Sequence, residues 1–287
     1  MRPFAARACR LAVRFALLAA TFTVVVMPAR AQVDEATAEL LMRASGLWEQ
    51  LGVTAAGARA GIEAASRNGL TPLSTEEVQR LLRATDAAFE AGTLRAAVRR
   101  SLAAQLPPAD VAALEAWLAG EPGRRITALE VAAARPERDS ERAIRSGIEH
   151  LATAPPERKR LLESLVEASH AAESITNMTI NIAVAVQRGM AGVRPDLPAP
   201  PVTELRQAFA AQRAQMLGAY RGMSQALFAE MYSALPDADL AHYLAFLRGG
   251  PGARFVFATM AATEQALVEA AERLGTRLPA ARPAANT

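Results

Sequence analysis

The chain is poor in cysteine, lysine and aromatic residues, and these shortages narrow the chemistry it can perform. Cys9 is the only cysteine among 287 residues, and it lies in a segment that we expect to be removed, so the mature protein has no disulfide and no thiol chemistry. Lys159 is the only lysine among 32 basic residues, a bias typical of a GC-rich bacterial genome rather than of a physical requirement. Aromatic residues make up 5% of the chain, and Trp117, Tyr243 and Phe246 lie on apolar helix faces, which favours the core over a ligand platform.

The sequence also lacks an apolar run long enough to cross a membrane as a helix. The uncharged, mostly apolar run Phe15–Met27 has 13 residues, whereas a span needs about 20. Four arginines precede this run and the triplet Ala29-Arg30-Ala31 follows it, which is the pattern of a secretory signal peptide. We therefore predict that residues 1–31 are cleaved off between Ala31 and Gln32, and that the mature protein is soluble and periplasmic. The alternative is retention of this segment as an anchor.

Removal of the signal peptide changes the charge of the protein. The full chain carries a formal charge of +3, but residues 1–31 hold five arginines and no acidic residue. The mature chain therefore has 27 basic and 29 acidic residues, a formal balance of −2, and its composition gives no argument for nucleic acid as a partner. We interpret the local basic clusters Arg99-Arg100 and Arg158-Lys159-Arg160 as solvated helix faces.

The most informative feature that is present is an internal repeat. Residues 106–133 align without a gap on residues 235–262, and 13 of the 28 positions are identical. Five of these are alanines, which a chain this rich in alanine produces by chance. The other eight are Leu106/Leu235, Pro107/Pro236, Asp110/Asp239, Leu118/Leu247, Gly120/Gly249, Pro122/Pro251, Gly123/Gly252 and Arg125/Arg254.

Each aligned segment has the pattern of a helical hairpin. A proline and an early aspartate begin the first helix, apolar residues recur along it at helical spacing, and glycines with a proline end it. A second helix follows, with Ile126 and Leu129 on its inner side in one copy and Phe255 and Ala258 in the other. The apolar positions of the first helix are Val111, Leu114, Trp117 and Leu118 in one copy and Leu240, Tyr243, Phe246 and Leu247 in the other.

The segments before the hairpins repeat the same layout more weakly. Helical stretches are predicted over residues 40–65 and 161–187, and Ser74 with Glu77 has the spacing of a capping box that begins a further helix. The two stretches share the dipeptide Ala-Ser, at Ala44-Ser45 and at Ala168-Ser169.

No convincing strand pattern occurs, and glycine and proline separate long helical segments. The sequence therefore predicts an all-α fold of two tandem, internally similar helical bundles. We place the first at residues 32–154, which ends in a connecting helix within 135–154, and the second at residues 155–278. Residues 279–287 are expected to be a disordered tail.

Four positions of each hairpin carry a resemblance to a known family. They are an early acidic residue, the apolar residue after it, an inward aromatic residue and a glycine six residues later: Asp110, Val111, Trp117 and Gly123, and Asp239, Leu240, Phe246 and Gly252. This pattern resembles the bacterial domain-of-unknown-function 2059 family, whose members are small exported helical proteins. The chain departs from the family where a proline directly precedes the glycine, at Pro122 and Pro251, and in holding the unit twice. The resemblance implies an exported helical protein and implies no activity.

The best local cluster of polar residues combines three glutamates and a histidine, Glu163, Glu167, His170 and Glu173, which the spacing places along one stripe of one helix. Glu167 and His170 have the spacing used in di-iron bundles, but those sites need two such motifs and further glutamates, and the sequence holds no second motif. We interpret the stripe as a solvated face, with metal binding as the alternative, because a zinc site needs three or four converging ligands.

Asp239 and His242 form another pair at helical spacing, which could orient an imidazole for base catalysis. The first copy holds Asp110 and Ala113 at these positions, so the start of the helix explains the aspartate without the histidine. The sequence has no nucleophile elbow around a serine, no phosphate-binding loop, no dinucleotide fingerprint and no zinc-protease motif. It therefore assigns no catalytic, cofactor-binding or metal-binding residue, and it predicts no cofactor.

Two aromatic residues of the second hairpin cannot both point inward. Phe255 and Phe257 lie two apart and therefore on different faces of one helix. An exposed phenylalanine beside Met231 and Met260 would suit a contact with a partner protein, with lipid or with the other half of the chain.

Export, duplication and the lack of a catalytic signature favour a non-enzymatic protein of the bacterial envelope. It would bind another envelope protein, or a second copy of itself, through a helical face or the cleft between its halves. One alternative is a metal-binding or hydrolytic periplasmic enzyme built on Glu167 and His170. Another is a protein that lies on the membrane surface through an amphipathic helix. Neither a nucleic-acid partner nor a stable transmembrane segment is predicted after cleavage.

Overall fold

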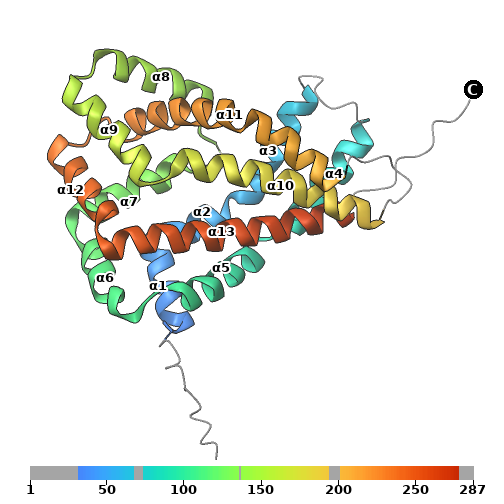
Figure 1. Ribbon diagram of the computed structural model, residues 1–287, viewed down its shortest axis with the longest axis horizontal. Helices are drawn as coiled ribbons and strands as arrows, with labels where there is room; N and C mark the ends of the chain where they lie inside the picture. The colour runs from blue at the N-terminus through green and yellow to red at the C-terminus, as the bar shows by residue number, and fades with distance from the viewer. Residues whose placement is uncertain (1–31, 68–73, 136, 194–200, 278–287) are drawn as a thin grey trace, which may run out of the picture. The chain divides into compact units, whose positions relative to one another are not determined.

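A computed structural model of the protein describes residues 32–67, 74–135, 137–193 and 201–277 (Figure 1). Within these ranges every regular element is a helix, so the predicted all-α fold is confirmed. The predicted signal peptide and the predicted tail, 279–287, lie outside the described residues. The elements are α1 (Glu35–Ala44), α2 (Leu47–Gly52), α3 (Thr54–Arg67), α4 (Thr75–Ala88), α5 (Ala91–Gln105), the short 3₁₀ helix η1 (Pro108–Asp110), α6 (Val111–Ala119), α7 (Glu121–Ala133), α8 (Ser140–Thr153), α9 (Pro156–Ala168), α10 (Ala171–Val193), α11 (Val202–Met231), α12 (Asp237–Arg248) and α13 (Gly250–Arg277).

The helix boundaries follow the local signals where those signals are strong. The capping box at the start of α4 is confirmed: Ser74 Oγ accepts a hydrogen bond from the Glu77 N–H at 3.3 Å, and the Glu77 carboxylate accepts one from the Ser74 N–H at 2.8 Å. Both aligned segments are helical hairpins, α6–α7 and α12–α13, each turning at the predicted glycine. None of the helices in the described ranges is both long and apolar enough to span a bilayer.

The predicted continuous helical stretches over 40–65 and 161–187 are each broken next to the shared Ala-Ser dipeptide, and the first is broken again at Val53, between α2 and α3. After α1, Gly46 has φ 74°, and after α9, His170 has φ 51°. In both places the serine hydroxyl donates to the carbonyl three residues earlier, Ser45 to Met42 and Ser169 to Val166. A serine that bonds its own backbone competes with continued helix, and a left-handed residue then redirects the chain. The matched dipeptide therefore marks a helix end rather than a helix interior.

The long helices lie side by side in one series. α8 packs on α11, α11 on α10, α10 on α13 and α13 on α5, so these five helices follow one another from top to bottom of Figure 1. α13 presents a row of fully buried alanines to its neighbours, including Ala262, Ala266 and Ala270. Small side chains let two helix backbones approach closely, which explains how α13 packs on helices at both of its sides.

The hydrophobic cores cross the boundary predicted at residue 155. One core joins α1, α5 and α6, including Leu41, Leu94 and Leu114, to the inner face of α13 from Phe255 onward. The other joins α9, α11 and α12 to Ile126 of α7. The first helix of each hairpin thus packs in the core of its own half, whereas the second helix reaches the core of the other half. α13 also packs along α10 of its own half. The described residues from Gln32 onward accordingly form one compact unit.

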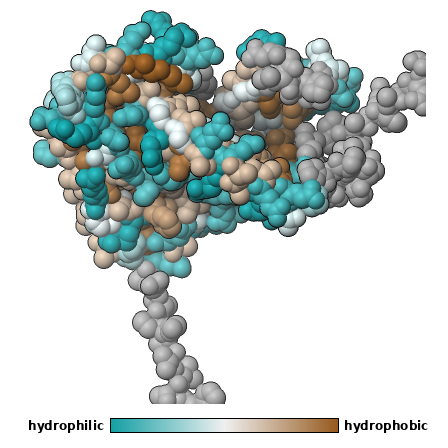
Figure 2. Space-filling model, turned by 45° about the horizontal axis from the view of Figure 1, so that its top comes forward, coloured by the Kyte–Doolittle hydropathy of each residue, from teal (hydrophilic) through white to brown (hydrophobic). Residues whose placement is uncertain are grey.

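The two phenylalanines at the start of α13 lie on opposite faces, as predicted. The side chain of Phe255 is 6% exposed and that of Phe257 is 69% exposed. Two other large apolar residues are also well exposed, Leu40 on α1 and Ile148 on α8. Figure 2 shows hydrophobic surface lying among hydrophilic residues on the face that carries α8 and α11.

Candidate functional site

The two hairpins meet at their matched aromatic positions. The ring of Trp117 on α6 lies 4.5 Å from the ring of Phe246 on α12, and the two planes are inclined by 7°. The ring of Tyr243 continues this stack, 6.2 Å from that of Trp117. A stacked pair contributes about 0.5–1.5 kcal/mol beyond its burial, so this contact ties the hairpins together at equivalent points.

Two ion pairs join the hairpins in a reciprocal manner. Arg254 donates from Nε and Nη2 to both carboxylate oxygens of Asp110, each at 2.6 Å. Arg125 donates from Nη1 to Asp239 at 2.7 Å. Each arginine therefore binds the aspartate of the other hairpin, and hydrogen bonding to Arg254 holds the pKa of Asp110 below its usual range. Sequence reasoning explained both aspartates by the helix start alone. The identity of the aspartate and the arginine in both copies was the sequence signal for this pairing.

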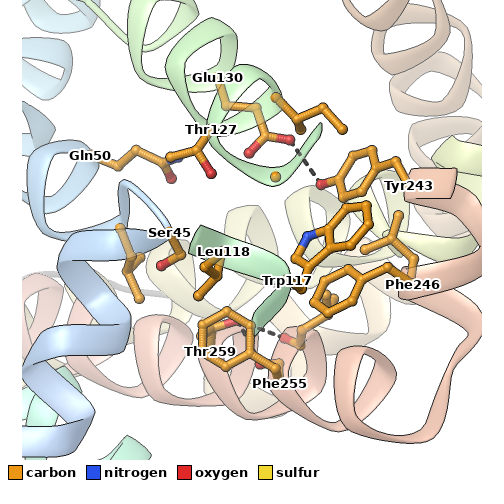
Figure 3. A pocket seen from close by; sticks show the side chains of 15 residues that line it. Ser45, Gln50, Trp117, Leu118, Thr127, Glu130, Tyr243, Phe246, Phe255 and Thr259 are labelled. Atoms are coloured by element: carbon orange, nitrogen blue, oxygen red, sulfur yellow. Dashed lines mark hydrogen bonds between the residues drawn. The ribbon is translucent and has the colours of Figure 1, made fainter. Parts of the chain in front are cut away.

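A cavity of about 160 Å³ lies where the hairpins meet α1 and α2 (Figure 3). Its apolar wall comes from the hairpins and includes Trp117, Leu118, Phe246 and Phe255. Its polar groups come from three directions: Ser45 and Gln50 next to and within α2, Thr127 and Glu130 on α7, and Tyr243 and Thr259 on α12 and α13.

Glu130 is the central polar group of this cavity. One oxygen of its carboxylate, Oε1, accepts hydrogen bonds from the hydroxyls of Tyr232 at 2.7 Å and Tyr243 at 2.8 Å. Burial raises the pKa of Glu130, and the two hydroxyls oppose that shift because they bond to the charged form. Burial also raises the pKa of both tyrosines well above their usual range, so both remain hydrogen-bond donors at neutral pH.

The cavity is asymmetric although the hairpins that form it are aligned in sequence. The position that aligns with Glu130 is Thr259, whose hydroxyl donates to carbonyls of its own helix, those of Phe255 and Val256, both at 2.9 Å. The junction therefore holds one carboxylate rather than two. The sequence contained a signal for Glu130, since it lies one helical turn after Ile126 on the predicted inner face of α7, and sequence reasoning did not use it.

The prediction that Glu163, Glu167, His170 and Glu173 share one stripe of one helix is wrong. α9 ends at Ala168 and the left-handed His170 separates it from α10, so the four residues lie on two helices and a turn. Glu163, Glu167 and His170 are exposed, and Glu173 pairs with Arg221 at 3.7 Å. Over the described ranges, no group of three or more His, Cys, Asp or Glu side chains is placed to hold a metal ion.

The second histidine pair also does not form a site. Asp239 is occupied by Arg125, and His242 is exposed one turn later on α12. His150 instead meets Glu230 of α11 at 3.2 Å, together with Ser146, whose hydroxyl donates to the same carboxylate at 2.6 Å. The carboxylate lies between the histidine and the serine, so the histidine is not placed to activate the hydroxyl.

The fold and the site define an all-α protein in which two helical hairpins, with α1 and α2, line a cavity that holds one carboxylate. Comparison of the chain with models of protein families, with curated proteins and with solved structures finds no match in any of the three. The resemblance to the domain-of-unknown-function 2059 family therefore stays a prediction.

Replacing Glu130 with glutamine is expected to change how stability depends on pH. A carboxyl whose pKa is raised in the folded protein contributes stability below its unfolded pKa, ordinarily 4.5, and that contribution is lost as pH rises through the folded pKa. The free energy of unfolding of the wild type should therefore fall, relative to that of Glu130→Gln, as pH rises above 4.5. Urea unfolding at a series of pH values measures the difference. Glu115→Gln, on the exposed side of α6, makes the same charge change as a control, and a wild-type advantage that grows with pH would contradict the prediction.

Proposed function

We propose that this chain is an exported, non-enzymatic binding protein of the bacterial envelope, and that its binding site is the cavity between the hairpins. One observation carries the proposal: a single carboxylate, that of Glu130, is fixed by Tyr232 and Tyr243 beside a wall of stacked aromatic rings. Small-molecule sites combine an apolar wall with a few fixed polar groups, which is the composition of this cavity. The signal-peptide pattern of residues 1–31 supports a periplasmic location.

The side chains around the cavity favour binding over catalysis. The hydroxyls of Ser45 and Thr259 donate to backbone carbonyls rather than to Glu130, the lining carboxylate that could act as a base, and no histidine or lysine is among the described residues that line the cavity. Nucleophilic catalysis needs a base within hydrogen-bond reach of the nucleophile. The proposal therefore assigns a recognition role to Glu130.

We also propose that residues 32–154 and 155–278 arose as two copies of one unit. The support comes from aligned positions that make equivalent contacts. The identical arginines each bind the aspartate of the other hairpin, and the aligned aromatic residues Trp117 and Phe246 stack on each other. Duplication then lets one copy hold Glu130 while the other holds Thr259, which creates a single polar end in the cavity.

The test is whether small molecules bind next to Trp117. Trp48→Phe leaves Trp117 as the only tryptophan of the chain, so its fluorescence reports on the cavity. We expect a saturable change on titration with at least one of three single-ring probes: benzylamine, benzyl alcohol or benzoate. Thr127→Phe, at the cavity, should abolish the change, whereas Thr203→Phe, exposed near the start of α11, should retain it. The proposal fails if none of the probes gives a saturable change, or if Thr127→Phe binds as the parent does.

A second function, binding of a partner protein through a helical face, is favoured by Phe257. Phe257 is 69% exposed on a long helix, so a partner protein that covered its ring would remove apolar surface from water. Burial of such an aromatic anchor contributes favourably to the free energy of binding. In affinity capture from envelope extract, we expect the immobilised mature protein to bind one envelope protein in stoichiometric amount. The Phe257→Asp variant is expected not to bind it. Leu40→Asp, at the similarly exposed Leu40 of α1, is the matched control, and equal loss in both variants would contradict this function.

A further inference from the structure

The charge of the cavity is set by one residue. Among the described residues that line it, Glu130 is the only one with an ionisable side chain of ordinary pKa below neutrality, and none is arginine, lysine or histidine. An anionic ligand would meet a carboxylate with no basic side chain to offset it, whereas a cationic ligand would meet a counter-ion. The lining therefore discriminates between ligands by the sign of their charge.

The second oxygen of Glu130 is available to a ligand. Both tyrosine hydroxyls donate to Oε1, and no described residue donates to Oε2. In the described part of the chain, Arg80 Nε is the one fully buried side-chain polar atom without a partner, so Oε2 is not sealed inside the protein. A carboxylate oxygen is an acceptor only, and it therefore requires a ligand group that donates a hydrogen bond.

The aromatic wall lies beside the carboxylate. Figure 3 shows the Glu130 carboxyl group at the same end of the cavity as Tyr243 and Trp117, with Phe255 and Thr259 toward the other end. Because the Trp117 ring is stacked with Phe246 and Tyr243, it contributes apolar surface beside the carboxylate rather than an open face for a cation. This end of the cavity therefore suits a cationic group that carries an apolar body.

The size of the cavity limits the ligand. Its volume of about 160 Å³ is close to that of an engineered cavity of about 150 Å³ in another protein that binds benzene. The cavity therefore accommodates a body of about one aromatic ring, which would lie against Phe246, Phe255 and Leu118.

We propose that the cavity binds a small organic amine in its protonated form, with the ammonium group on Oε2 of Glu130 and a body of about one ring on the apolar wall. This inference rests on the proposed function and specifies the class of ligand. A bound ammonium group places a positive charge beside the carboxylate, which opposes the effect of burial. Binding is therefore expected to lower the pKa of Glu130 and to release a proton where the Glu130 carboxyl is protonated.

The test compares three probes of the same ring and different charge on the Trp48→Phe protein near neutral pH: benzylamine as benzylammonium, benzyl alcohol as its neutral counterpart, and benzoate. Benzylammonium is expected to bind at least about tenfold more tightly than benzyl alcohol, since hydrogen bonds between charged groups are the stronger ones, and benzoate is expected to bind most weakly. Tighter binding of benzyl alcohol or benzoate overturns the amine assignment while the proposed binding function stands. Absence of binding by all three overturns both.

Two glutamate variants test whether the preference for benzylammonium arises at Glu130. Glu130→Gln is expected to lower the affinity for benzylammonium by about tenfold and to leave that for benzyl alcohol unchanged. Glu115→Gln removes the same charge from the exposed side of α6 and should change neither affinity. If Glu130→Gln keeps the preference for benzylammonium, the ammonium group does not bind at Glu130 and the inference is overturned. The comparison of the three probes on the parent protein decides the inference even where Glu130→Gln alters folding.

Discussion

Gly252→Ala is expected to lower the free energy of unfolding by about 2–4 kcal/mol, because the added methyl group meets backbone rather than a movable side chain. A Cβ at Gly252 would overlap the carbonyl oxygen of Phe246 in the turn between α12 and α13. The same holds for Gly123 and the carbonyl oxygen of Trp117 in the first hairpin. Each turn would have to open, and opening it would separate the stacked rings of Trp117 and Phe246.

Urea unfolding of the mature protein, followed by circular dichroism, measures this effect. Gly218→Ala provides the matched control, because Gly218 lies within α11 and a Cβ there would meet nothing within 4 Å. That variant is expected to gain about 0.4–1 kcal/mol, since alanine restricts the unfolded chain and favours helix. A Gly252→Ala protein as stable as the wild type would show that the turn can widen without loss of packing.

Tyr232→Ala is expected to destabilise the protein by about 3–5 kcal/mol, the range for removing a large aromatic side chain from a core. Tyr232 is 1% exposed and is the largest of the fully buried side chains. Its ring packs edge-on against Phe228 at 5.4 Å and Tyr243 at 6.2 Å, and its hydroxyl bonds Glu130. Removal of the ring therefore leaves a void in the core of α9, α11 and α12, and it also takes one donor from the carboxylate.

Tyr232→Phe separates the two contributions. It retains the ring and removes one hydrogen bond, so the expected loss is about 1 kcal/mol. Because the hydroxyl opposes the rise in the pKa of Glu130, its removal should raise that pKa further. Leu40→Ala, at a residue 61% exposed, should stay within about 0.5 kcal/mol of the wild type in the same unfolding measurement. An equal loss in Tyr232→Ala and Tyr232→Phe would contradict the packing argument.

The two ion pairs between the hairpins link the turn of each hairpin to the first helix of the other. They are consistent with the packing of α7 and α13 in different hydrophobic cores. Arg254 and Arg125 follow the turns of their hairpins. Arg254 reaches Asp110 and Arg125 reaches Asp239, each at the start of the other hairpin's first helix. The Asp110 side chain is 5% exposed, whereas the Arg254 side chain is 52% exposed. Water screens a pair that is open at one end, so we regard these pairs as fixing the orientation of the hairpins more than adding to stability.

The sequence by itself determined the local structure. The spacing of Leu114 and Leu118, and of Leu240 and Leu247, predicted the buried faces of the two first helices, because an apolar side chain every third or fourth residue lies on one side of a helix. The opposite orientations of Phe255 and Phe257 followed from the same geometry. Helix continuity could not be predicted as well, since the breaks at Gly46 and His170 depend on one left-handed residue within an otherwise helical pattern.

Only the tertiary structure decided what the hairpins contact and where the site lies. Helical periodicity states which face of a helix is buried, but it does not state which neighbour buries it, so the exchange of α7 and α13 between the cores was not predictable. The same reason applies to Glu130. Its place one turn after Ile126 puts it on the inner side of α7, but it becomes the polar centre of a cavity only because Tyr232 and Tyr243 approach from more than 100 residues away. Burial and hydrogen-bond partners, which give the carboxylate its chemistry, are properties of the packed chain.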